Sequence, residues 1–183
     1  MSQKKLYDNI TLLSHDDNFI GYISKKKTNW YLNKNLGNMI NDTTCKLNFK
    51  GNFKGETLPS NIFKQTNNCV ICDTETNLTK FSLIHKDIKK ILPQNYRSRR
   101  SHAILPVCTE CRSDVDSIMA EEIKEVIGFD SYTNYHQNIK KYADKIIHDK
   151  ISPYDLEKIW ANKFYEIFEP QHLPNGWSEF FEN

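Results

Sequence analysis

Two Cys-x-x-Cys pairs constrain this 183-residue chain more strongly than any other feature of its sequence. Cys69 and Cys72 form the first pair, and Cys108 and Cys111 form the second after 35 intervening residues. Two residues between the members of a pair let both sulfurs face one ion, and a tetrahedral zinc site takes four such thiolates. The sequence therefore predicts a structural Zn²⁺ ion held by these four cysteines, with no coordination position left open for catalysis. The fifth cysteine, Cys45, is expected to pack in a core.

The elements around the two pairs predict the fold class. Residues 103–108 have the composition of a short strand, and apolar residues at 115–127 recur at steps of three and four, as on one helix face. The second pair thus stands at a helix N-terminus, whose partial positive charge favours thiolates. A knuckle, a hairpin and a helix that carries the second pair make a treble clef. We therefore expect an α+β fold with a treble-clef, HNH-like zinc-binding core and flanking helices.

Local signals predict further elements outside this core. Residues 18–24 are rich in aromatic and β-branched side chains and predict a strand. Thr28 is a candidate N-cap for a short helix that ends at Gly37. Ser152 followed by a proline predicts the start of another helix, which should end near Glu169.

The chain is expected to divide into three parts and to lie inside the cell. An N-terminal α+β lead-in (1–66) packs on the treble-clef module (67–130), and helices with an extended tail complete the chain (131–183). No apolar run is long enough to span a membrane, and the first residues lack the apolar core of a secretory signal. We therefore expect no membrane association and a cytoplasmic or nuclear location, where thiols stay reduced and available to metals.

Basic residues are concentrated in the segment between and beside the two cysteine pairs. The whole chain has a formal net charge of only +2, but residues 80–112 hold eight basic and two acidic residues, a local charge of +6. All four arginines of the chain fall within residues 97–112. A basic segment in an otherwise acidic chain indicates a polyanionic partner, and we expect DNA or RNA.

We assign this contact to seven residues. Guanidinium and ammonium groups would bind phosphates, and an aromatic ring among them would stack on a base or donate a hydrogen bond. The predicted nucleic-acid-binding residues are Lys89, Lys90, Tyr96, Arg97, Arg99, Arg100 and Arg112. An alternative is a protein-interaction adaptor, in which the helices bind a partner protein and the zinc only holds the fold.

A metal-dependent endonuclease of the HNH type is a further hypothesis. Such an enzyme needs a general-base histidine, for which His85 and His102 are the candidates, and a cation such as Mg²⁺ or Mn²⁺. The usual helix ligand would follow the last cysteine, where this chain has Arg112. The usual orienting residue would begin the last strand, where it has Ala103. These positions predict weak catalysis or none.

Two sets of carboxylates offer further metal ligands. Asp114 and Asp116 follow the second cysteine pair, although nothing in the sequence fixes the direction of their side chains. The sequence DTET at 73–76 looks like the first acidic motif of a 3′-5′ exonuclease, but that chemistry needs further acidic motifs in a large α/β domain. Because the motif directly follows Cys72, we expect it in the turn of the knuckle.

Six segments occur in an order that resembles one known family. They are YDNITLL (7–13), NWYLNKNLG (29–37), CVIC (69–72), ILPQNYR (91–97), SHAILPVCTEC (101–111) and EPQHLPNGW (169–177). The same order is similar to the region that follows the exonuclease domain in the exonuclease 3′-5′ domain-containing proteins. The resemblance covers about residues 6–178.

This resemblance implies a zinc-binding, HNH-like accessory region in a family that acts on DNA or RNA. It carries the zinc ligands onto the four paired cysteines and an ILPxxYR element onto Pro93, Tyr96 and Arg97. The family's catalytic carboxylates lie in its exonuclease domain, so none is carried over. The family has an acidic residue after the Ser-His pair and a histidine after the last cysteine, where this chain has Ala103 and Arg112. The resemblance therefore implies a module that binds nucleic acid without strong catalytic activity.

Overall fold

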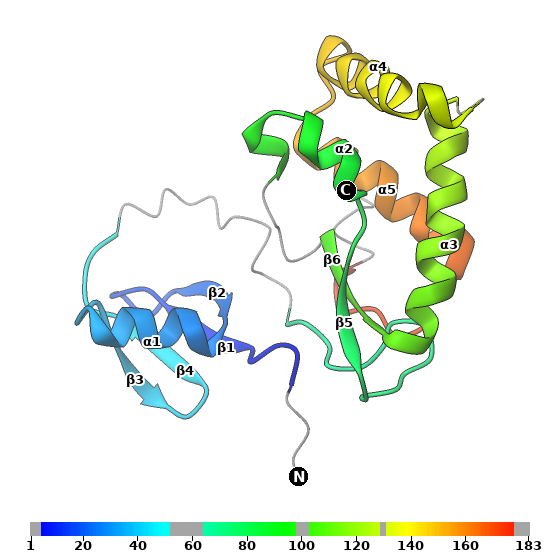
Figure 1. Ribbon diagram of the computed structural model, residues 1–183. Helices are drawn as coiled ribbons and strands as arrows, with labels where there is room; N and C mark the ends of the chain where they lie inside the picture. Colours follow the sequence, from blue (N-terminus) through cyan, green and yellow to red (C-terminus); the bar gives the residue numbers. More distant parts are fainter. Residues whose placement is uncertain (1–4, 52–63, 98–102, 129–130, 178–183) are drawn as a thin grey trace.

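The computed structural model describes residues 5–51, 64–97, 103–128 and 131–177 (Figure 1). Within these ranges the chain is a mixed α+β protein with a four-stranded and a two-stranded sheet, which confirms the predicted class. Its strands and helices are, in chain order, β1 (Ile10–Leu13), β2 (Phe19–Ile23), α1 (Lys25–Asn33), β3 (Gly37–Asn41), β4 (Thr44–Leu47), β5 (Leu78–Ser82), α2 (Lys86–Ile91), β6 (Ile104–Cys108), α3 (Thr109–Val126), α4 (Tyr135–His148) and α5 (Pro153–Phe168). Short 3₁₀ turns lie at Gln94–Arg97 and Tyr132–Asn134.

The first sheet has the strand order β2-β1-β4-β3 and its own small core. β1 pairs parallel with β4 and antiparallel with β2, while β3 and β4 form an antiparallel hairpin. Successive side chains of a strand alternate between the two faces of a sheet. Ile10 and Leu12 of β1 and Cys45 and Leu47 of β4 are therefore buried on one face, so Cys45 packs as expected.

Helix α1 begins earlier than the sequence predicted. Its N-cap is Ser24, whose hydroxyl accepts the Lys27 N–H at 3.2 Å. Thr28, the predicted N-cap, is buried inside the helix and donates its hydroxyl to the Ser24 carbonyl at 3.1 Å. The prediction was wrong because serine and threonine both suit the N-cap, and the three lysines between them carry no apolar pattern. Gly37 opens β3, where an added Cβ would lie 2.8 Å from the Lys46 carbonyl oxygen.

The second sheet and the helices α2 to α5 share one larger core. β5 pairs antiparallel with β6, and α3 continues directly from β6 (Figure 1). Phe81 of β5, Leu105 of β6 and Trp160 of α5 are buried in this core, and so is Trp177 of the tail. α5 begins at the predicted place, with Ser152 as its N-cap. None of the helices in the described ranges combines the length and the apolar character needed to span a bilayer.

The residues before β1 join the N-terminal sheet to the cysteine-bearing part of the chain. The Tyr7 N–H donates to Asn67 Oδ1 at 2.8 Å, and Asn67 Nδ2 donates back to the Tyr7 carbonyl at 3.0 Å. Asn9 Nδ2 donates to the Gln65 carbonyl at 2.7 Å, and the Gln65 N–H donates to Asn9 Oδ1 at 3.1 Å. Lys80 Nζ lies 4.6 Å from the centroid of the Tyr7 ring. These contacts hold Tyr7 beside β5.

Candidate metal centre and basic pocket

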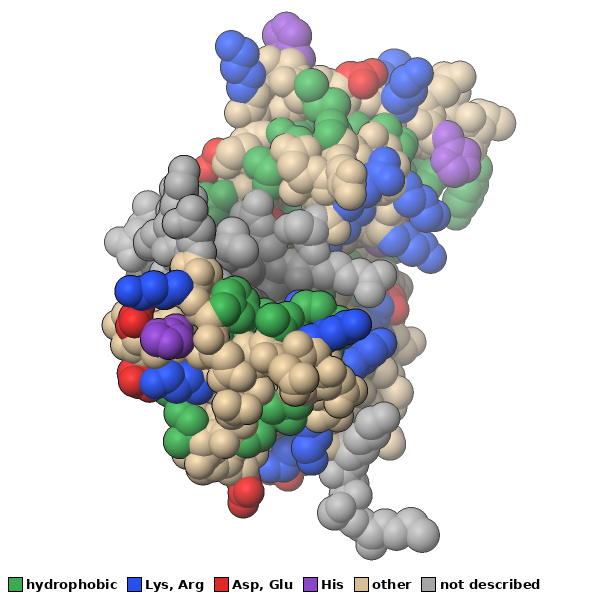
Figure 2. All heavy atoms as spheres, turned by 90° about the vertical axis from the view of Figure 1, so that its left-hand side faces the viewer, with side chains coloured by type: hydrophobic (Ala, Val, Ile, Leu, Met, Phe, Trp, Pro, Cys, Tyr) green, Lys and Arg blue, Asp and Glu red, His purple; other side chains and the backbone are tan. Residues whose placement is uncertain are grey.

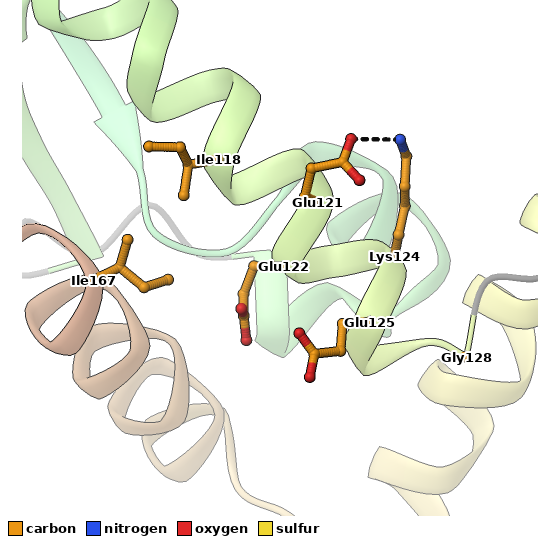
Figure 3. A pocket seen from close by; sticks show the side chains of 7 residues that line it. All are labelled: Ile118, Glu121, Glu122, Lys124, Glu125, Gly128 and Ile167. Carbon is orange, nitrogen blue, oxygen red and sulfur yellow. Dashed lines mark hydrogen bonds and ion pairs between the residues drawn. The ribbon is translucent and has the colours of Figure 1, made fainter.

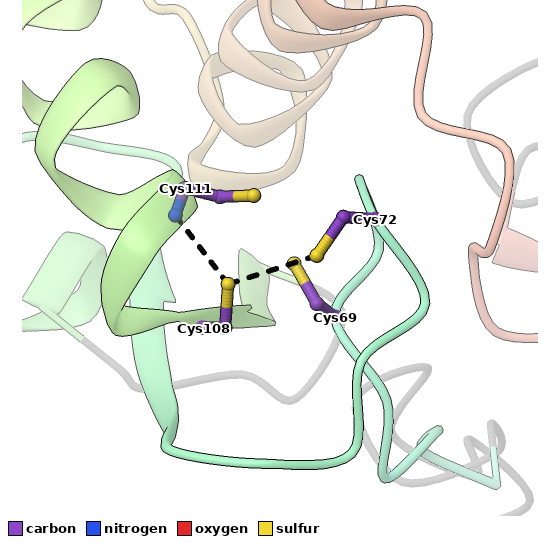
Figure 4. Close-up of side chains that lie close together, drawn as sticks. All are labelled: Cys69, Cys72, Cys108 and Cys111. Atoms are coloured by element: carbon purple, nitrogen blue, oxygen red, sulfur yellow. Dashed lines mark hydrogen bonds between the residues drawn. The ribbon is translucent and has the colours of Figure 1, made fainter.

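The four paired cysteines meet at one point (Figure 4). The Sγ atoms of Cys69, Cys72, Cys108 and Cys111 all lie within 4.8 Å of one another. The Sγ atoms of Cys72 and Cys108 are 3.7 Å apart, far beyond the roughly 2.05 Å of a disulfide bond. Thiolates placed tetrahedrally at about 2.3 Å from a zinc ion are about 3.8 Å from one another, so this spacing fits. The cluster can hold a metal ion such as zinc.

Backbone hydrogen bonds turn the first pair toward the second. The Cys69 N–H donates to the Thr74 carbonyl at 2.8 Å, and the Asp73 N–H donates to the Cys69 carbonyl at 3.0 Å. Asp73 has a φ of 63°, a left-handed conformation that aspartate adopts more readily than most residues. The Val70 N–H donates to the Pro106 carbonyl at 3.0 Å. The turn is therefore packed directly on β6, the strand that leads to the second pair.

The second pair lies where β6 passes into α3. Cys108 ends β6 and is the N-cap of α3, and its Sγ accepts the Cys111 N–H at 3.4 Å. The partial positive charge of this helix N-terminus stabilises a thiolate. The Thr109 N–H donates to the Asn77 carbonyl at 3.1 Å, which holds the first residue of α3 against the turn before β5. The strand-to-helix junction expected from the sequence thus positions both sulfurs.

Four adjacent thiols cannot all ionise unless a cation offsets their charge. Burial raises the pKa of Cys111 far above its ordinary value, and the neighbouring sulfurs add to this effect. Burial alone would also raise the pKa of Cys69, but backbone hydrogen bonds from Cys108, Cys72 and Ile71 outweigh burial and lower it. A divalent cation would favour ionisation of all four.

The DTET segment is part of the turn that carries the first pair. The Asp73 carboxylate accepts a hydrogen bond from Asn68 Nδ2 and lies 3.3 Å from His172 Nδ1. The His172 N–H donates to the Val70 carbonyl at 3.2 Å, so the tail covers this turn. The described residues form only the two small sheets and their helices, without the large α/β domain of an exonuclease.

Five basic residues line a cavity of about 650 Å³ that we call the basic pocket. They are Lys80 from β5, Lys86, Lys89 and Lys90 from α2, and Arg97 from the turn that follows α2. The other described lining residues are Tyr7, Ser82, Ile84 and Ile104, so no carboxylate is among them. Figure 2 shows one group of lysine and arginine side chains on the upper part of one face of the molecule, and others spread over the lower part of that face. A cavity with this lining attracts anions.

Three of the predicted nucleic-acid-binding residues lie in the basic pocket and are held there by neighbouring groups. Lys89 Nζ donates to Ser82 Oγ at 2.9 Å. Lys90 Nζ lies 2.9 Å from the Asp87 carboxylate. Arg97 donates from Nε and Nη2 to two backbone carbonyls at the end of α2, at 2.8 Å each. These contacts limit the conformational freedom of the three side chains and keep their charges near α2.

Tyr96 and Arg112, also predicted to contact nucleic acid, bond to other parts of the protein. The Tyr96 ring packs against the larger core, and its hydroxyl donates to the Ile151 carbonyl at 2.7 Å. Arg112 Nε donates to both carboxylate oxygens of Asp116, at 2.8 Å and 2.7 Å, and Nη1 donates to a carbonyl of β5 at 3.0 Å. Three further predicted site residues, Arg99, Arg100 and His102, lie outside the described residues.

His85, one of the two candidate general bases, is the N-cap of α2. Its Nδ1 accepts the Asp87 N–H at 3.3 Å and lies 3.6 Å from the Asp87 carboxylate. Burial is the largest influence on its pKa and lowers that pKa below the ordinary value of 6.5. His85, Arg112 and Asp116 line one cavity of about 320 Å³, beside the basic pocket. Because Arg112 bonds both oxygens of Asp116, this carboxylate is already engaged.

The sequence did not assign Tyr7, Lys80 and Lys86 to the site. Both lysines were visible within the basic segment, but their meeting in one cavity depends on how α2 packs beside β5. Tyr7 is far from them in the sequence, and no local pattern there indicates that its ring lies against Lys80. Only the pairing of the first residues with residues 65–67 brings the ring to the pocket.

A hollow between α3 and α5 has the opposite charge (Figure 3). It is lined by Ile118, Glu121, Glu122, Lys124, Glu125, Gly128 and Ile167. Glu121 lies 2.7 Å from Lys124, and Glu122 pairs with Lys163. Its carboxylates would repel a phosphate, so this hollow is no candidate for nucleic-acid contact.

Comparison with known proteins finds nuclease-related relatives that share part of this sequence. Protein RRP6-like 3 of Arabidopsis thaliana is 28% identical over 127 residues, which are 67% of this chain and 14% of that protein. Exonuclease 3′-5′ domain-containing protein 2 of Drosophila melanogaster is 31% identical over 115 residues, 59% of this chain and 19% of that protein. The Homo sapiens protein of the same name is 27% identical over 112 residues, 59% of this chain and 18% of that protein. The chain thus spans less than a fifth of the length of each.

No family model and no solved structure matches the chain. The relatives therefore show similarity of sequence over about three fifths to two thirds of this chain. What these longer proteins do as a whole is a separate matter from the role of the segment that they share with this chain.

Proposed function

We propose that this chain is a zinc-stabilised nucleic-acid-binding module without strong catalytic activity. The observation that carries the proposal is the basic pocket, because five cations and no described carboxylate line it. The zinc ion would hold the knuckle, the β5–β6 pair and α3 together as a treble clef of the HNH type. That frame would support the pocket, since β5 supplies one of its lysines and α2 follows β5 in the chain.

The relatives support a role near nucleic-acid processing. Two of them are named for an exonuclease domain, and we infer that this chain corresponds to an HNH-like region outside that domain. We keep the division into 1–66, 67–130 and 131–183, with the helices of the last part packed in the core of the module. The need for reduced thiols favours a cytoplasmic or nuclear location.

Within the pocket, we assign the phosphate contacts to the lysines of β5 and α2. Arg97 adds positive charge while it holds the end of α2. We assign no phosphate contact to Tyr96 and Arg112, because their polar groups form hydrogen bonds within the protein and support its fold. Arg99 and Arg100 remain predicted phosphate contacts in the segment that follows the pocket.

Salt dependence of binding tests the proposal. Anisotropy of a labelled single strand should show an association constant that falls with salt, because phosphate contacts release counterions. Four contacts would give a logarithmic slope of about −3, or about a 50-fold loss between 50 and 200 mM salt. A flat affinity over this range would contradict a phosphate-binding role.

A triple variant then tests where the strand binds. Changing Lys86, Lys89 and Lys90 to alanine should reduce the magnitude of the slope by about 2 for a single strand. The matched control changes the three lysines at the start of α1, Lys25 to Lys27, to alanine. If the control alone lost binding, the interface would lie on the N-terminal sheet and the assignment to the basic pocket would be wrong.

A metal-dependent endonuclease is the second candidate, because His85 and Asp116 line one cavity. His85 would accept a proton from the attacking water, and Asp116, once released by Arg112, would hold Mg²⁺ or Mn²⁺. Nicking of a supercoiled plasmid with either ion, by the protein and by its His85→Ala and His102→Ala variants, tests this function. Loss of nicking in one variant would identify the base, and a wild-type protein that does not nick would exclude the candidate.

A further inference from the structure

We propose that the basic pocket binds a terminal phosphomonoester, the phosphorylated end of a nucleic-acid strand. This inference rests on the proposed function and adds which part of a polynucleotide enters the pocket. Three features support it: the charge of the lining, the directions from which the cations come, and the size and walls of the cavity.

The charge of the lining favours a monoester over a diester. Five cations line the cavity, and the Asp87 carboxylate beside Lys90 offsets only part of their charge. A phosphomonoester carries about −1.5 to −2 charges at pH 7 and presents three acceptor oxygens. An internal phosphodiester carries about one charge. A compact group of cations therefore gains more from one strand end than from one internal phosphate.

The cations reach the pocket from three elements. Lys80 comes from β5, Lys86 and Lys89 come from α2, and Arg97 comes from the turn that follows. The hydrogen bond from Lys89 Nζ to Ser82 Oγ, at 2.9 Å, positions that ammonium group before any ligand binds. Cations that line one cavity from three elements can together bind the three terminal oxygens of a monoester. A protein that binds the middle of a strand instead has its cations along a groove that follows the strand's backbone.

The size and the walls of the cavity suit a strand end. Its volume of about 650 Å³ falls within the roughly 300–1,000 Å³ of sites that enclose small ligands. Tyr7, Ile84 and Ile104 give it an apolar wall against which a sugar and a base can pack. Tyr7 belongs to the segment before β1, so the wall is completed by a part of the chain outside the zinc module.

Strands that differ only at their ends test the inference. The zinc-loaded full chain is titrated into identical 12-nucleotide strands with a 5′-phosphate, with a 3′-phosphate, with hydroxyls at both ends, and closed into a circle. At least one phosphorylated strand should bind about tenfold more tightly than the hydroxyl-ended strand and the circle, as expected for added charge-assisted contacts. Competition by free 5′- and 3′-mononucleotides distinguishes a strand end from a free nucleotide as the source of the monoester.

A charge reversal tests whether the preference arises in the basic pocket. Lys86→Glu should remove the preference for phosphorylated ends, and Lys86→Ala should weaken it. Lys26→Glu is the matched control and should retain the preference, since both residues are exposed lysines in the first turn of a helix. Glutamate is favourable at that position, so neither reversal opposes the helix dipole.

Each outcome bears on the inference. Equal binding of phosphorylated, hydroxyl-ended and circular strands would overturn it and leave nucleic-acid binding in place. A preference that survives in folded, zinc-loaded Lys86→Glu would overturn its assignment to the basic pocket. Failure of every strand to bind would overturn the proposed function as well, so the two failures are distinguishable.

Discussion

Cys72 is far less buried than two of the other cysteines of the cluster. Cys69 and Cys108 are only 0% and 1% exposed, whereas Cys72 is exposed to solvent. A buried thiol is retained in part because it fills space in a core. An exposed thiol gains little from burial, so the position of Cys72 is best explained by metal binding.

Replacing Cys72 with serine should therefore remove metal with little direct loss of packing. The apparent zinc affinity should fall by more than about 100-fold, since changes in groups that only support metal ligands already cost 10- to 100-fold. Competition with a chromogenic chelator measures this affinity. Cys45→Ala is the control: it makes a cavity in the other core but should retain one zinc per chain. An unchanged zinc affinity in Cys72→Ser would contradict the assignment.

His85 makes a contribution to stability that depends on pH. Burial lowers its folded-state pKa below 6.5, so near and below that pH the unfolded chain binds more protons at this site than the folded protein. The contribution is therefore fully present above about pH 6.5 and is lost as the pH falls toward the lower folded-state pKa.

His85→Asn should remove this dependence and retain the N-cap of α2, because asparagine is a favourable N-cap. Urea unfolding at pH 7.5 and 5.5 measures the free energy of unfolding of both proteins. The wild type should lose more stability between these pH values than the variant does. The charged neighbours Asp87, Lys86, Lys90 and Asp116 are the same in both proteins. An equal loss would show that burial of His85 does not disfavour its protonation.

At the scale of elements, helix starts follow local chemistry wherever the capping residue is unambiguous. Ser152 Oγ accepts the Asp155 N–H at 3.1 Å, and the Asp155 carboxylate accepts the Ser152 N–H at 3.3 Å, a reciprocal pair that begins α5. The start of α1 was predicted wrongly, since Ser24 and Thr28 compete for the same role within one turn. β3 was not predicted, because a glycine and two asparagines, which are rare in strands, outnumber its single β-branched residue, and its pairing with β4 supplies the missing stability.

The capping pair of α5 allows a direct measurement. Ser152→Ala should lower the free energy of unfolding by about 1 kcal/mol, the usual value for loss of an N-cap. Ser152→Asn should recover most of this loss, because asparagine accepts the same hydrogen bond. Chemical denaturation of the three proteins compares them. If alanine and asparagine gave the same stability, the cap would contribute little to α5.

At the scale of the whole molecule, the two cores depend differently on the metal. The core of the N-terminal sheet contains Cys45 but none of the four clustered cysteines, while the larger core includes Cys69 and Cys108. Structural zinc contributes on the order of 10 kcal/mol, which is comparable with the whole stability of a typical domain. We therefore expect that the larger core does not stay folded after the metal is removed.

Chelation of the metal should remove protection from hydrogen exchange in β5, β6 and α3, which the cluster joins. Protection in β1 and β4 should persist to a greater extent, because these strands pair with each other and pack in their own core. Nucleic-acid binding should be lost together with the larger core, because the basic pocket is built on β5 and α2. Exchange followed by mass spectrometry measures each segment, and full protection of α3 after chelation would contradict a structural metal.

Features that depend on residues close together in the chain could be predicted from the sequence. Each Cys-x-x-Cys pair, the Ser152-Pro153 helix start and the junction of β6 with α3 are set by neighbours within a turn, so their patterns were sufficient. The sequence also located the basic segment and the mixed α+β class. It was not sufficient for the individual roles of Tyr96, Arg97 and Arg112, whose polar groups bond to the protein.

The folding of the whole chain places Tyr7 against Lys80 and brings β5, α2 and the turn after it around one cavity. It also brings the sulfurs of Cys72 and Cys108, which 35 residues separate, to a distance of 3.7 Å. The physical reason is the range of the interactions. Caps and turns act over three or four residues, whereas contacts between distant segments form only when packing of the whole core fixes the path of the chain between them.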